Sequence, residues 1–371
     1  MRYFDYAATT PIDKEVMDTY IKVENNYFAN TTSLHSLGQK SNVLLEQASA
    51  EIKDLLGVKE HNIVYTSNAT EANNLAIYGI AKKYSHGKLI TSKIEHPSVY
   101  EVFKNLETEG YEVVYLDVDE KGIIDSNQLR KEMNKNTILV SIMWVNNIVG
   151  AIQPIKEVID IVRKYPKAKL HVDAVQGVAK INPDFGFGEI DLLTISGHKI
   201  YGPKGIGALI YHQNIDLSKR LYGSSAQFGV KPGTISLALI VSLCKALKKF
   251  IPLWEKHYQY VFGLNRRFRN QLTNNEKIVF NSSLEASPYI INISLPHVNG
   301  ETLVHILEEK EIYVSTGSAC SSKLKKPEKT VYHITKSELL ATTTIRISLS
   351  HLLLPTDIDE IAREIGAIAN V

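Results

Sequence analysis

One lysine follows directly after an apolar run, in a segment rich in small residues. Lys199 lies in the stretch SGHKIYGPKG, residues 196–205. A lysine just past a buried strand can be held neutral by desolvation, which makes its amine a nucleophile toward aldehydes. Asp173 ends another apolar run, 170–173. Such an amine and such a carboxylate are the minimum set for pyridoxal 5'-phosphate, although a surface lysine and a helix-capping aspartate would each give the same local pattern.

Polar side chains follow other apolar runs as well. Thr70 opens a helical pattern, where its hydroxyl and the free N–H groups of a helix start would suit a phosphate. His96 could stack on a cofactor ring, and Asn147 could donate to a ring hydroxyl. Gln176 and His198 follow two further runs. Helix capping is the ordinary alternative for some of these residues, but five such strand ends together indicate one ligand site at a sheet edge.

The two cysteines stand in different surroundings. Cys320 lies among small residues and glycine, a composition typical of an exposed, mobile loop, and four nearby lysines would favour its thiolate. An incidental thiol in a solvated basic loop remains the alternative. Cys244 lies in a helical pattern and is expected to be a small core residue.

Arg346 lies between two isoleucines in a short apolar run. An arginine in that position needs a partner of opposite charge. A substrate carboxylate held by the guanidinium fork would supply one, and a structural ion pair is equally compatible with the pattern.

The elements that must position these residues follow from the pattern of apolar runs. Short runs alternate with helical patterns over residues 62–212, which predicts a mostly parallel sheet with helices on both faces. Residues 236–275 are expected to form a long helical connector. A smaller second α/β unit is predicted from strands near 289–293, 312–314 and 344–347 and helices near 300–310 and 357–369.

Composition excludes several classes of function. The 371 residues carry 42 basic and 40 acidic side chains, a net charge of +2, so direct binding of nucleic acid is not expected. The first residues lack the apolar core of a signal peptide, and no run approaches bilayer length, so no membrane association is expected. Two cysteines cannot build a disulfide framework. These features predict a cytoplasmic protein with two domains.

These residues together resemble the class V aminotransferase family, and within it cysteine desulfurases of the NifS/IscS type. The most specific pieces are SGHKIYGPKG at 196–205 and GSACS at 317–321, and the resemblance runs from YFDYAATTP at 3–11 to the Arg346 run. It implies an α/β fold of the fold type I pyridoxal 5'-phosphate-dependent transferases and a homodimer with active sites at the subunit interface. The large domain, with a mostly parallel mixed sheet flanked by helices, would span 13–250. The smaller C-terminal α/β domain would comprise 1–12 and 251–371.

The resemblance also implies a role for each matching residue. Lys199 would carry the covalent link to pyridoxal 5'-phosphate, Asp173 would bind the pyridine nitrogen, and His96 would lie on the ring face and act in catalysis. Cys320 would take the substrate sulfur. Further contacts are implied to the ring oxygen by Asn147 and Gln176, to the phosphate by Ala69, Thr70, Ser196 and His198 and by Thr234 of the other subunit, and to the substrate carboxylate by Arg346 and Asn30. No metal is expected.

The implied reaction converts L-cysteine to L-alanine and passes sulfur to an acceptor protein, either an iron–sulfur scaffold or a tRNA-thiolation enzyme. Alternatives are a selenocysteine lyase, another class V lyase or aminotransferase, and a cofactor-binding sulfur-transfer scaffold with little turnover. The sequence departs from the family's usual residues at 144–148, 223–227 and 231–234, at Thr31 and at Asn68.

Overall fold

The computed structural model describes residues 1–317 and 327–370. Its main sheet has seven strands in the spatial order β2-β8-β7-β6-β5-β3-β4. The strands are β2 (His61–Thr66), β3 (Lys88–Ser92), β4 (Glu112–Leu116), β5 (Thr137–Met143), β6 (Lys169–Asp173), β7 (Leu192–Ser196) and β8 (Gly207–His212). Only β8 runs antiparallel to its neighbours β2 and β7. The expected mostly parallel, mixed sheet is therefore confirmed.

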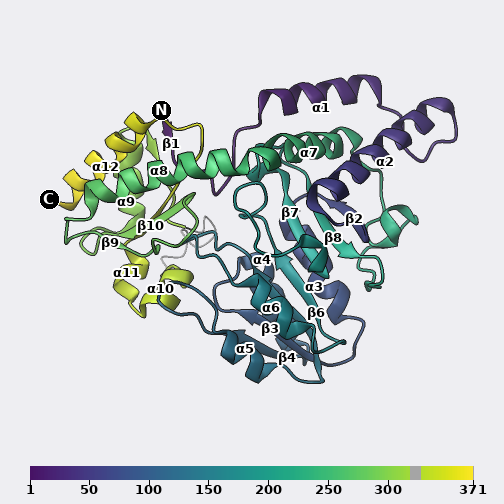
Figure 1. Ribbon diagram of the computed structural model, residues 1–371, viewed down its shortest axis with the longest axis horizontal. Helices are drawn as coiled ribbons and strands as arrows, with labels where there is room; N and C mark the ends of the chain where they lie inside the picture. The colour runs from purple at the N-terminus through teal and green to yellow at the C-terminus, as the bar shows by residue number, and fades with distance from the viewer. Residues whose placement is uncertain (318–326, 371) are drawn as a thin grey trace.

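Helices cover both faces of this sheet because successive strand residues point to opposite sides. Leu192 belongs to the apolar core beneath α3 and α4, whereas Leu193 belongs to the core shared with α2, α6 and α7. Figure 1 shows these layers, with α1 outside α7. The helices are α1 (Lys14–Asn26), α2 (Ser36–Leu56), α3 (Ala69–Ala81), α4 (Pro97–Thr108), α5 (Ser126–Glu132), α6 (Ile155–Val162) and α7 (Leu237–Phe250).

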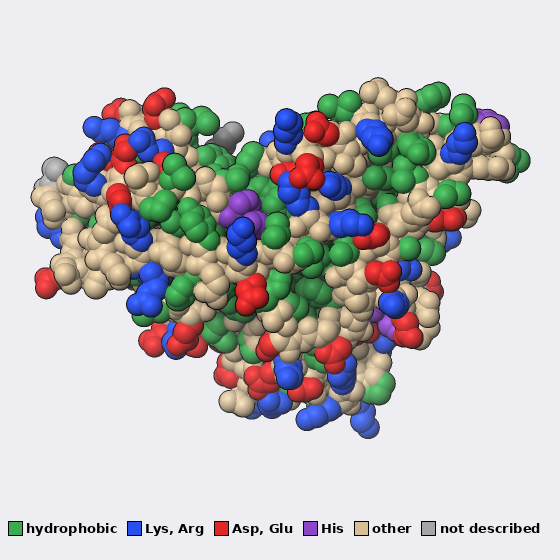
Figure 2. Space-filling model, turned by 45° about the horizontal axis from the view of Figure 1, so that its top comes forward, with side chains coloured by type: hydrophobic (Ala, Val, Ile, Leu, Met, Phe, Trp, Pro, Cys, Tyr) green, Lys and Arg blue, Asp and Glu red, His purple; other side chains and the backbone are tan. Residues whose placement is uncertain are grey.

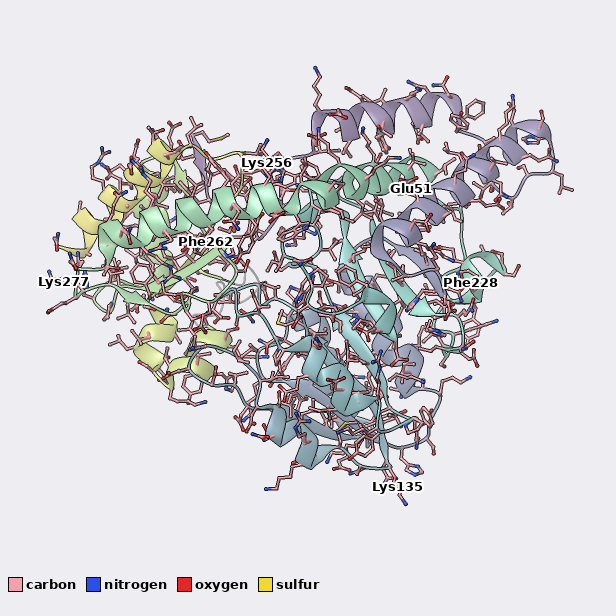
Figure 3. All side chains as sticks on the ribbon, in the orientation of Figure 1. Glu51, Lys135, Phe228, Lys256, Phe262 and Lys277 are labelled. Atoms are coloured by element: carbon pink, nitrogen blue, oxygen red, sulfur yellow. The ribbon has the colours of Figure 1, made fainter. Side chains whose placement is uncertain are left out.

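The connector predicted at 236–275 is two helices rather than one. A 3-10 turn, Ile251–Leu253, separates α7 from α8, which spans Trp254–Leu272. Pro252 explains the break, because its ring and missing N–H cannot continue an α-helix. Lys256 and Phe262 mark successive parts of α8 in Figure 3, and this helix extends from the large sheet to the C-terminal unit.

The C-terminal unit has its own antiparallel sheet and its own core. Its strands, in the order β12-β10-β9, are β12 (Thr344–Ser348), β10 (Ile290–Ser294) and β9 (Val279–Phe280). Its helices are α9 (Gly300–Glu308), α10 (Lys329–Thr335), α11 (Glu338–Thr342) and α12 (Pro355–Ala369). The strand expected near 312–314 does not join this sheet. It forms β11 (Ile312–Tyr313), which pairs in parallel with β1 (Arg2–Tyr3).

The N-terminal segment runs from the small unit to the edge of the large sheet. Phe4 is fully buried in the C-terminal core, and its carbonyl accepts a 2.7 Å hydrogen bond from the Ser348 N–H. Six residues later, the Thr10 N–H donates to the His198 carbonyl at 2.9 Å. Residues 4–10 therefore link the small sheet to the loop that carries Lys199. The division into 13–250 and 1–12 with 251–371, which the resemblance implies, stays a prediction.

A search of the helices in the described part of the chain finds no segment that combines the length and apolar character needed to cross a membrane.

Candidate active site

A cavity of about 330 Å³ lies at the carboxyl ends of the main sheet's strands, where open α/β sheets bind ligands. His96, Asn147 and Lys199 come from segments that follow β3, β5 and β7, and Asp173 ends β6. Arg346 reaches the same cavity from β12 of the small sheet. Its other lining residues include Asp5, Ala7, Ala8, Ala69, Thr70, Gln176, His198, Ser315 and Gly317. The sequence-predicted residues that line this cavity thus come from both units of the fold.

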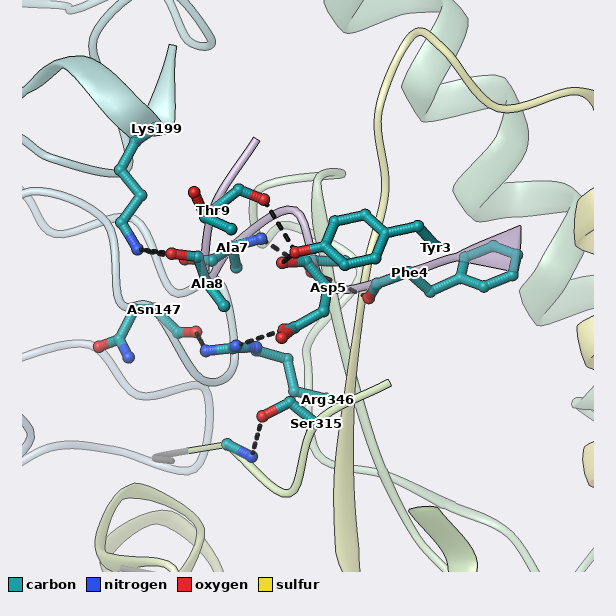
Figure 4. Close-up of polar contacts among 12 residues, drawn as sticks. Tyr3, Phe4, Asp5, Ala7, Ala8, Thr9, Asn147, Lys199, Ser315 and Arg346 are labelled. Atoms are coloured by element: carbon teal, nitrogen blue, oxygen red, sulfur yellow. Dashed lines mark hydrogen bonds and ion pairs between the residues drawn. The ribbon is translucent and has the colours of Figure 1, made fainter. Parts of the chain in front are cut away.

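Lys199 ends a 3-10 turn after β7 and points toward the N-terminal segment (Figure 4). Its Nζ donates hydrogen bonds to the carbonyls of Ala7 at 2.6 Å and Ala8 at 2.7 Å. Burial, and then the positive charge of Arg346, lower the pKa of Lys199 to about 8. The lowered pKa raises the uncharged fraction of this amine near neutral pH above that of an ordinary lysine, and the uncharged form is the state that attacks an aldehyde.

Asp173 is the last residue of β6 and is buried. One carboxylate oxygen accepts from the Val175 N–H at 3.1 Å. The other accepts from the side-chain amide of Asn73 at 2.8 Å. The two donors fix the carboxylate and leave it able to bind a protonated group in the cavity. Asn73, which the sequence analysis missed, lies on the buried face of α3, where an amide among apolar neighbours is the only sequence signal.

His96 caps α4 and also lines the cavity, so both roles considered for it are compatible with its position. Its Nδ1 accepts from the Ser98 N–H at 3.1 Å and lies 2.8 Å from the Ser98 hydroxyl. Burial lowers the pKa of His96, so the imidazole is neutral at neutral pH. The Ser98 hydroxyl in turn accepts from Asn73, which links His96 to Asp173 through two side chains.

The predicted phosphate contacts surround the start of α3 and the end of β7. Ala69 and Thr70 form the first turn of α3, whose N–H groups favour an anion. Ser196 ends β7, and its hydroxyl is buried without a hydrogen-bond partner among the described residues. His198 lies 3.3 Å from the Thr9 hydroxyl, and burial lowers its pKa to about 4. A buried hydroxyl without a partner is able to donate to a phosphate oxygen.

Gln176 lies between the cavity and a second buried lysine. Its amide donates to the Ala7 carbonyl at 2.9 Å, and its side-chain oxygen accepts from Lys180 Nζ at 3.1 Å. Burial lowers the pKa of Lys180 to about 7, with the positive charge of Lys199 as the next cause. The sequence analysis missed Lys180, whose only signal is a charged residue within the stretch 174–181, where every other residue except Gln176 is small or apolar. The second N–H of the Gln176 amide remains able to donate to a ligand.

Arg346 has a structural ion pair in addition to its place in the cavity. Its Nη2 donates to Asp5 Oδ1 at 2.8 Å, and its Nη1 donates to the Asn147 carbonyl at 2.9 Å. Figure 4 shows this fork between the N-terminal segment and the loop after β5. Its Nε is buried and has no hydrogen-bond partner within residues 1–317 and 327–370. The two roles that the sequence left open for Arg346 are therefore both compatible with the structure.

Among the described residues, the predicted Asn30, Thr234 and Ser196 are not part of the cavity lining. Asn30 is exposed in the turn between α1 and α2, where its side chain accepts from the Thr32 N–H and hydroxyl. Thr234 is exposed and lines a different pocket of this chain, near Lys231. Cys320 lies outside the residues that the structure describes. Cys244, in contrast, is buried in α7 as predicted, and burial raises the pKa of its thiol to about 11.

Trp144, one of the departures from the family pattern, is a core residue beneath the site. It is 1% exposed and packs edge-on against Phe185 and Phe187. A Cβ atom at Gly177 would lie 2.1 Å from its ring, so the indole requires glycine there. The indole of Trp144 therefore packs closely against Gly177, in the segment that follows Asp173.

Comparisons with known proteins identify relatives of this chain. Residues 2–361 match the family described as Aminotransferase class-V. A protein named NifS/IcsS protein homolog from Lactobacillus delbrueckii subsp. bulgaricus is 38% identical over 353 residues, which cover 94% of this chain and 92% of that protein. Cysteine desulfurase IscS of Neisseria meningitidis is 37% identical over 356 residues, which cover 94% and 87%. A solved structure named NifS-like protein matches all of both chains with a TM-score of 0.92 and 30% identity.

The chain therefore belongs to the class V aminotransferase family, whose members use pyridoxal 5'-phosphate. Within that family it is an enzyme of the cysteine desulfurase type, because relatives of that name match it over nearly its whole length. The residues present fit the cofactor. The buried amine of Lys199 would suit its aldehyde and the buried carboxylate of Asp173 its pyridine nitrogen, and the orphan hydroxyl of Ser196 is a free donor for a phosphate oxygen.

Proposed function

We propose that this protein converts L-cysteine to L-alanine, takes the released sulfur as a persulfide on Cys320, and passes it to an acceptor protein. The observation that carries the proposal is the single cavity in which Lys199, Asp173 and His96 face Arg346. The amine and the carboxylate suit the cofactor, and the guanidinium of Arg346 suits the carboxylate of an amino acid substrate.

Several residues would hold the cofactor in this cavity. Lys199 would bond its aldehyde, Asp173 its pyridine nitrogen, and His96 would cover the ring, with the remaining contacts made by Ala69, Thr70, Asn147, Gln176, Ser196 and His198. When bound, pyridoxal 5'-phosphate supplies an electron sink for the bond changes at the substrate's α-carbon.

Lys199 is the residue best placed to move the α-proton. Its lowered pKa, about 8, lets the amine accept a proton in one step and return it in another near neutral pH. The carbonyls of Ala7 and Ala8 hold the amine at the cavity wall. Asp173, fixed by two donors, would keep the proton on the pyridine nitrogen, and Arg346 would orient the substrate through its carboxylate.

Cys320 would receive the sulfur. Its thiolate attacks the substrate's sulfur, so a sulfur–sulfur bond forms on Cys320 while the carbon–sulfur bond of the substrate breaks. The electron pair of the broken bond stays with the carbon skeleton, which takes up a proton and leaves as L-alanine. No outside oxidant or reductant is needed, because the carbon is reduced as the sulfur is oxidised. The lysines near Cys320 in the sequence favour its thiolate.

The active enzyme is proposed to be a homodimer, with Thr234 of each subunit completing the phosphate site of the other. Thr234 is exposed and lies outside its own chain's main cavity. Exposed apolar side chains of this chain support a surface that a partner subunit would cover. Phe28 is 74% exposed, Leu34 91% and Tyr222 89%. Figure 2 shows apolar side chains gathered over the α1 and α2 end, and Figure 3 shows Phe228 at the same end.

Turnover of L-cysteine by the purified protein tests the proposed reaction. We expect alanine release from the wild type and from Cys244→Ser, and little from Cys320→Ser. Normal alanine release from Cys320→Ser would contradict the proposal and favour a different lyase on this fold. Faster turnover of selenocysteine than of cysteine in the wild type would indicate a selenocysteine lyase, and binding of pyridoxal 5'-phosphate without turnover of either would indicate a scaffold.

The acceptor is proposed to be either an iron–sulfur scaffold or a tRNA-thiolation enzyme. Mixing the enzyme loaded with labelled sulfur with purified candidates of each kind distinguishes them. The true acceptor should take label within the time of one turnover, whereas a protein that takes label no faster than free thiol in solution is excluded.

A further inference from the structure

The guanidinium of Arg346 already holds a carboxylate, that of Asp5, at the place where a substrate carboxylate would bind. Arg346 Nη2 and Asp5 Oδ1 are 2.8 Å apart, and both residues line the cavity. The Arg346 side chain is 3% exposed and that of Asp5 22%. An arginine this deeply buried needs an opposite charge when no ligand is present, and Asp5 supplies it.

An incoming carboxylate that binds Arg346 would share the guanidinium with Asp5. A bidentate grip uses either the Nη1/Nη2 edge or the Nε/Nη2 edge of the fork, and each edge includes one N–H of Nη2, the atom that already donates to Asp5. Nη2 is held by Asp5, and Nη1 already donates to the Asn147 carbonyl at 2.9 Å. Two carboxylates on one guanidinium would place like charges a few ångströms apart in a cavity that also contains Asp173.

Asp5 is the partner that can move. Its backbone is fixed, because its carbonyl accepts hydrogen bonds from Tyr3 Oη and the Ala8 N–H, each at 3.0 Å. Its partly exposed side chain can nevertheless rotate toward water without displacing the chain. Arg346 is held more tightly, since its backbone N–H donates to the Ser315 carbonyl at 2.6 Å and its strand, β12, pairs with β10.

The orphan Nε of Arg346 points to the same exchange. It is a buried cationic donor that has no partner in the described part of the chain. Asp5 uses one oxygen on this arginine, so the fork is not fully satisfied by its internal partner. A ligand carboxylate on the Nε/Nη2 edge would satisfy both donors, which is the gain that offsets the loss of the Asp5 contact.

We propose that Asp5 is a specificity-determining residue, an internal carboxylate that occupies the Arg346 fork in the free enzyme and is displaced by the carboxylate of an amino acid ligand. The proposal rests on the proposed function, because L-cysteine and L-alanine are the ligands that it considers. Asp5 then lowers affinity for every ligand that carries a carboxylate, while a ligand without one gains nothing from displacing it. Asp5 in this role sets KM rather than kcat.

Calorimetric binding of L-alanine to the holoenzyme, together with L-cysteine kinetics, tests this in Asp5→Asn. The amide keeps the shape of Asp5 but removes its charge, so the Kd of alanine and the KM of cysteine should fall by about three- to tenfold, the scale of a partly exposed ion pair with added repulsion. The kcat should change by less than about twofold. Cysteamine, which is cysteine without its carboxylate, should bind the variant and the wild type equally.

Asp359→Asn is the matched control, because Asp359 also pairs with an arginine, Arg267 at 2.6 Å, but on the surface of the C-terminal unit. It should leave the Kd of alanine, the KM and kcat of cysteine turnover and the binding of cysteamine unchanged. A higher KM and Kd in Asp5→Asn would overturn the proposal and make Asp5 a support for Arg346, and unchanged values would overturn it as well. Failure of the wild type to bind alanine or to turn over cysteine would instead reject the proposed function.

A crystal structure of wild-type holoenzyme with L-alanine gives a second test that needs no variant. The proposal expects the alanine carboxylate on Arg346 and the Asp5 side chain turned away. Alanine bound while Asp5 still accepts from Nη2 would contradict it.

Discussion

The two sides of the cavity are assembled in different ways. The main-sheet side takes its residues from the ends of neighbouring strands, so each lies where its own apolar run ends. The small-unit side depends on Arg346, whose carboxylate partner Asp5 stands 341 positions earlier in the chain. The first side is therefore fixed by local sequence and sheet topology, and the second by long-range packing of the N-terminal segment.

The two sides of the cavity also differ in the charge of their side chains. On the main-sheet side, burial lowers the pKa of both Lys199 and His96, which favours the uncharged form of each side chain near neutral pH. On the small-unit side, two full charges, Arg346 and Asp5, are held against each other. The first arrangement suits proton transfer and bonding to an aldehyde, and the second suits recognition of a charged ligand.

The largest effect is expected from removing the amine of the main-sheet side. Lys199→Ala should lose the covalent link to the cofactor and at least about a thousandfold in turnover, since no other group replaces a nucleophile. Absorption of the bound cofactor and alanine release measure both. Lys204→Ala, an exposed lysine of the same loop, is the control and should behave as wild type. An unchanged rate in Lys199→Ala would remove this residue from the mechanism.

Asp173→Asn should have the next largest effect. A neutral amide cannot hold the proton on a pyridine nitrogen, so turnover should fall by about tenfold to a thousandfold, the range of single electrostatic groups in catalysis. The fold should persist, because an amide can still accept from Asn73. The exposed Asp160→Asn serves as control, and both are measured by alanine release and thermal unfolding. Turnover like the wild type would show that this carboxylate is not catalytic.

The same difference explains how far the site could be predicted. Asp173 and His96 each follow an apolar run, so sequence alone placed them at one sheet edge. The resemblance supplied their roles. Neither the sequence pattern nor the resemblance indicated that Asp5 pairs with Arg346 or that Asn73 holds Asp173. Each contact joins two segments that lie far apart in the chain, and no local sequence pattern marks such a pair. The break at Pro252 was a local signal that the prediction of one long connector overlooked.

The pH dependence of cofactor loading tests the charge of Lys199. Only the uncharged amine bonds an aldehyde, so after removal of the cofactor the rate of reloading should rise with pH and level off above about 8, the lowered pKa of Lys199. Below that pH the rate should fall by roughly tenfold per unit, because the protonated fraction grows. Recovery of visible absorption measures the rate. A rate that keeps rising to pH 10 would mean that the amine has an ordinary lysine pKa.

The smallest effect is expected from removing the side chain of Asn73, which holds the Asp173 carboxylate in place. Asn73→Ala removes one donor to the carboxylate and the link to Ser98, so turnover should fall by about two- to tenfold. The neighbouring Asn74→Ala, whose amide donates only to the Thr70 carbonyl in the described structure, should fall less. Equal losses in the two variants would mean that Asn73 contributes to the stability of α3 rather than to the position of Asp173.

The central claim is that the cavity formed by these two sides delivers sulfur from cysteine to one particular thiol. Mass mapping of the purified holoenzyme after brief incubation with L-cysteine tests it directly, since the chain has only Cys244 and Cys320. The account predicts an added sulfur atom on the peptide that contains Cys320 and none on Cys244, which is buried in α7. Added sulfur on Cys244, or alanine release without added sulfur on either cysteine, would contradict it.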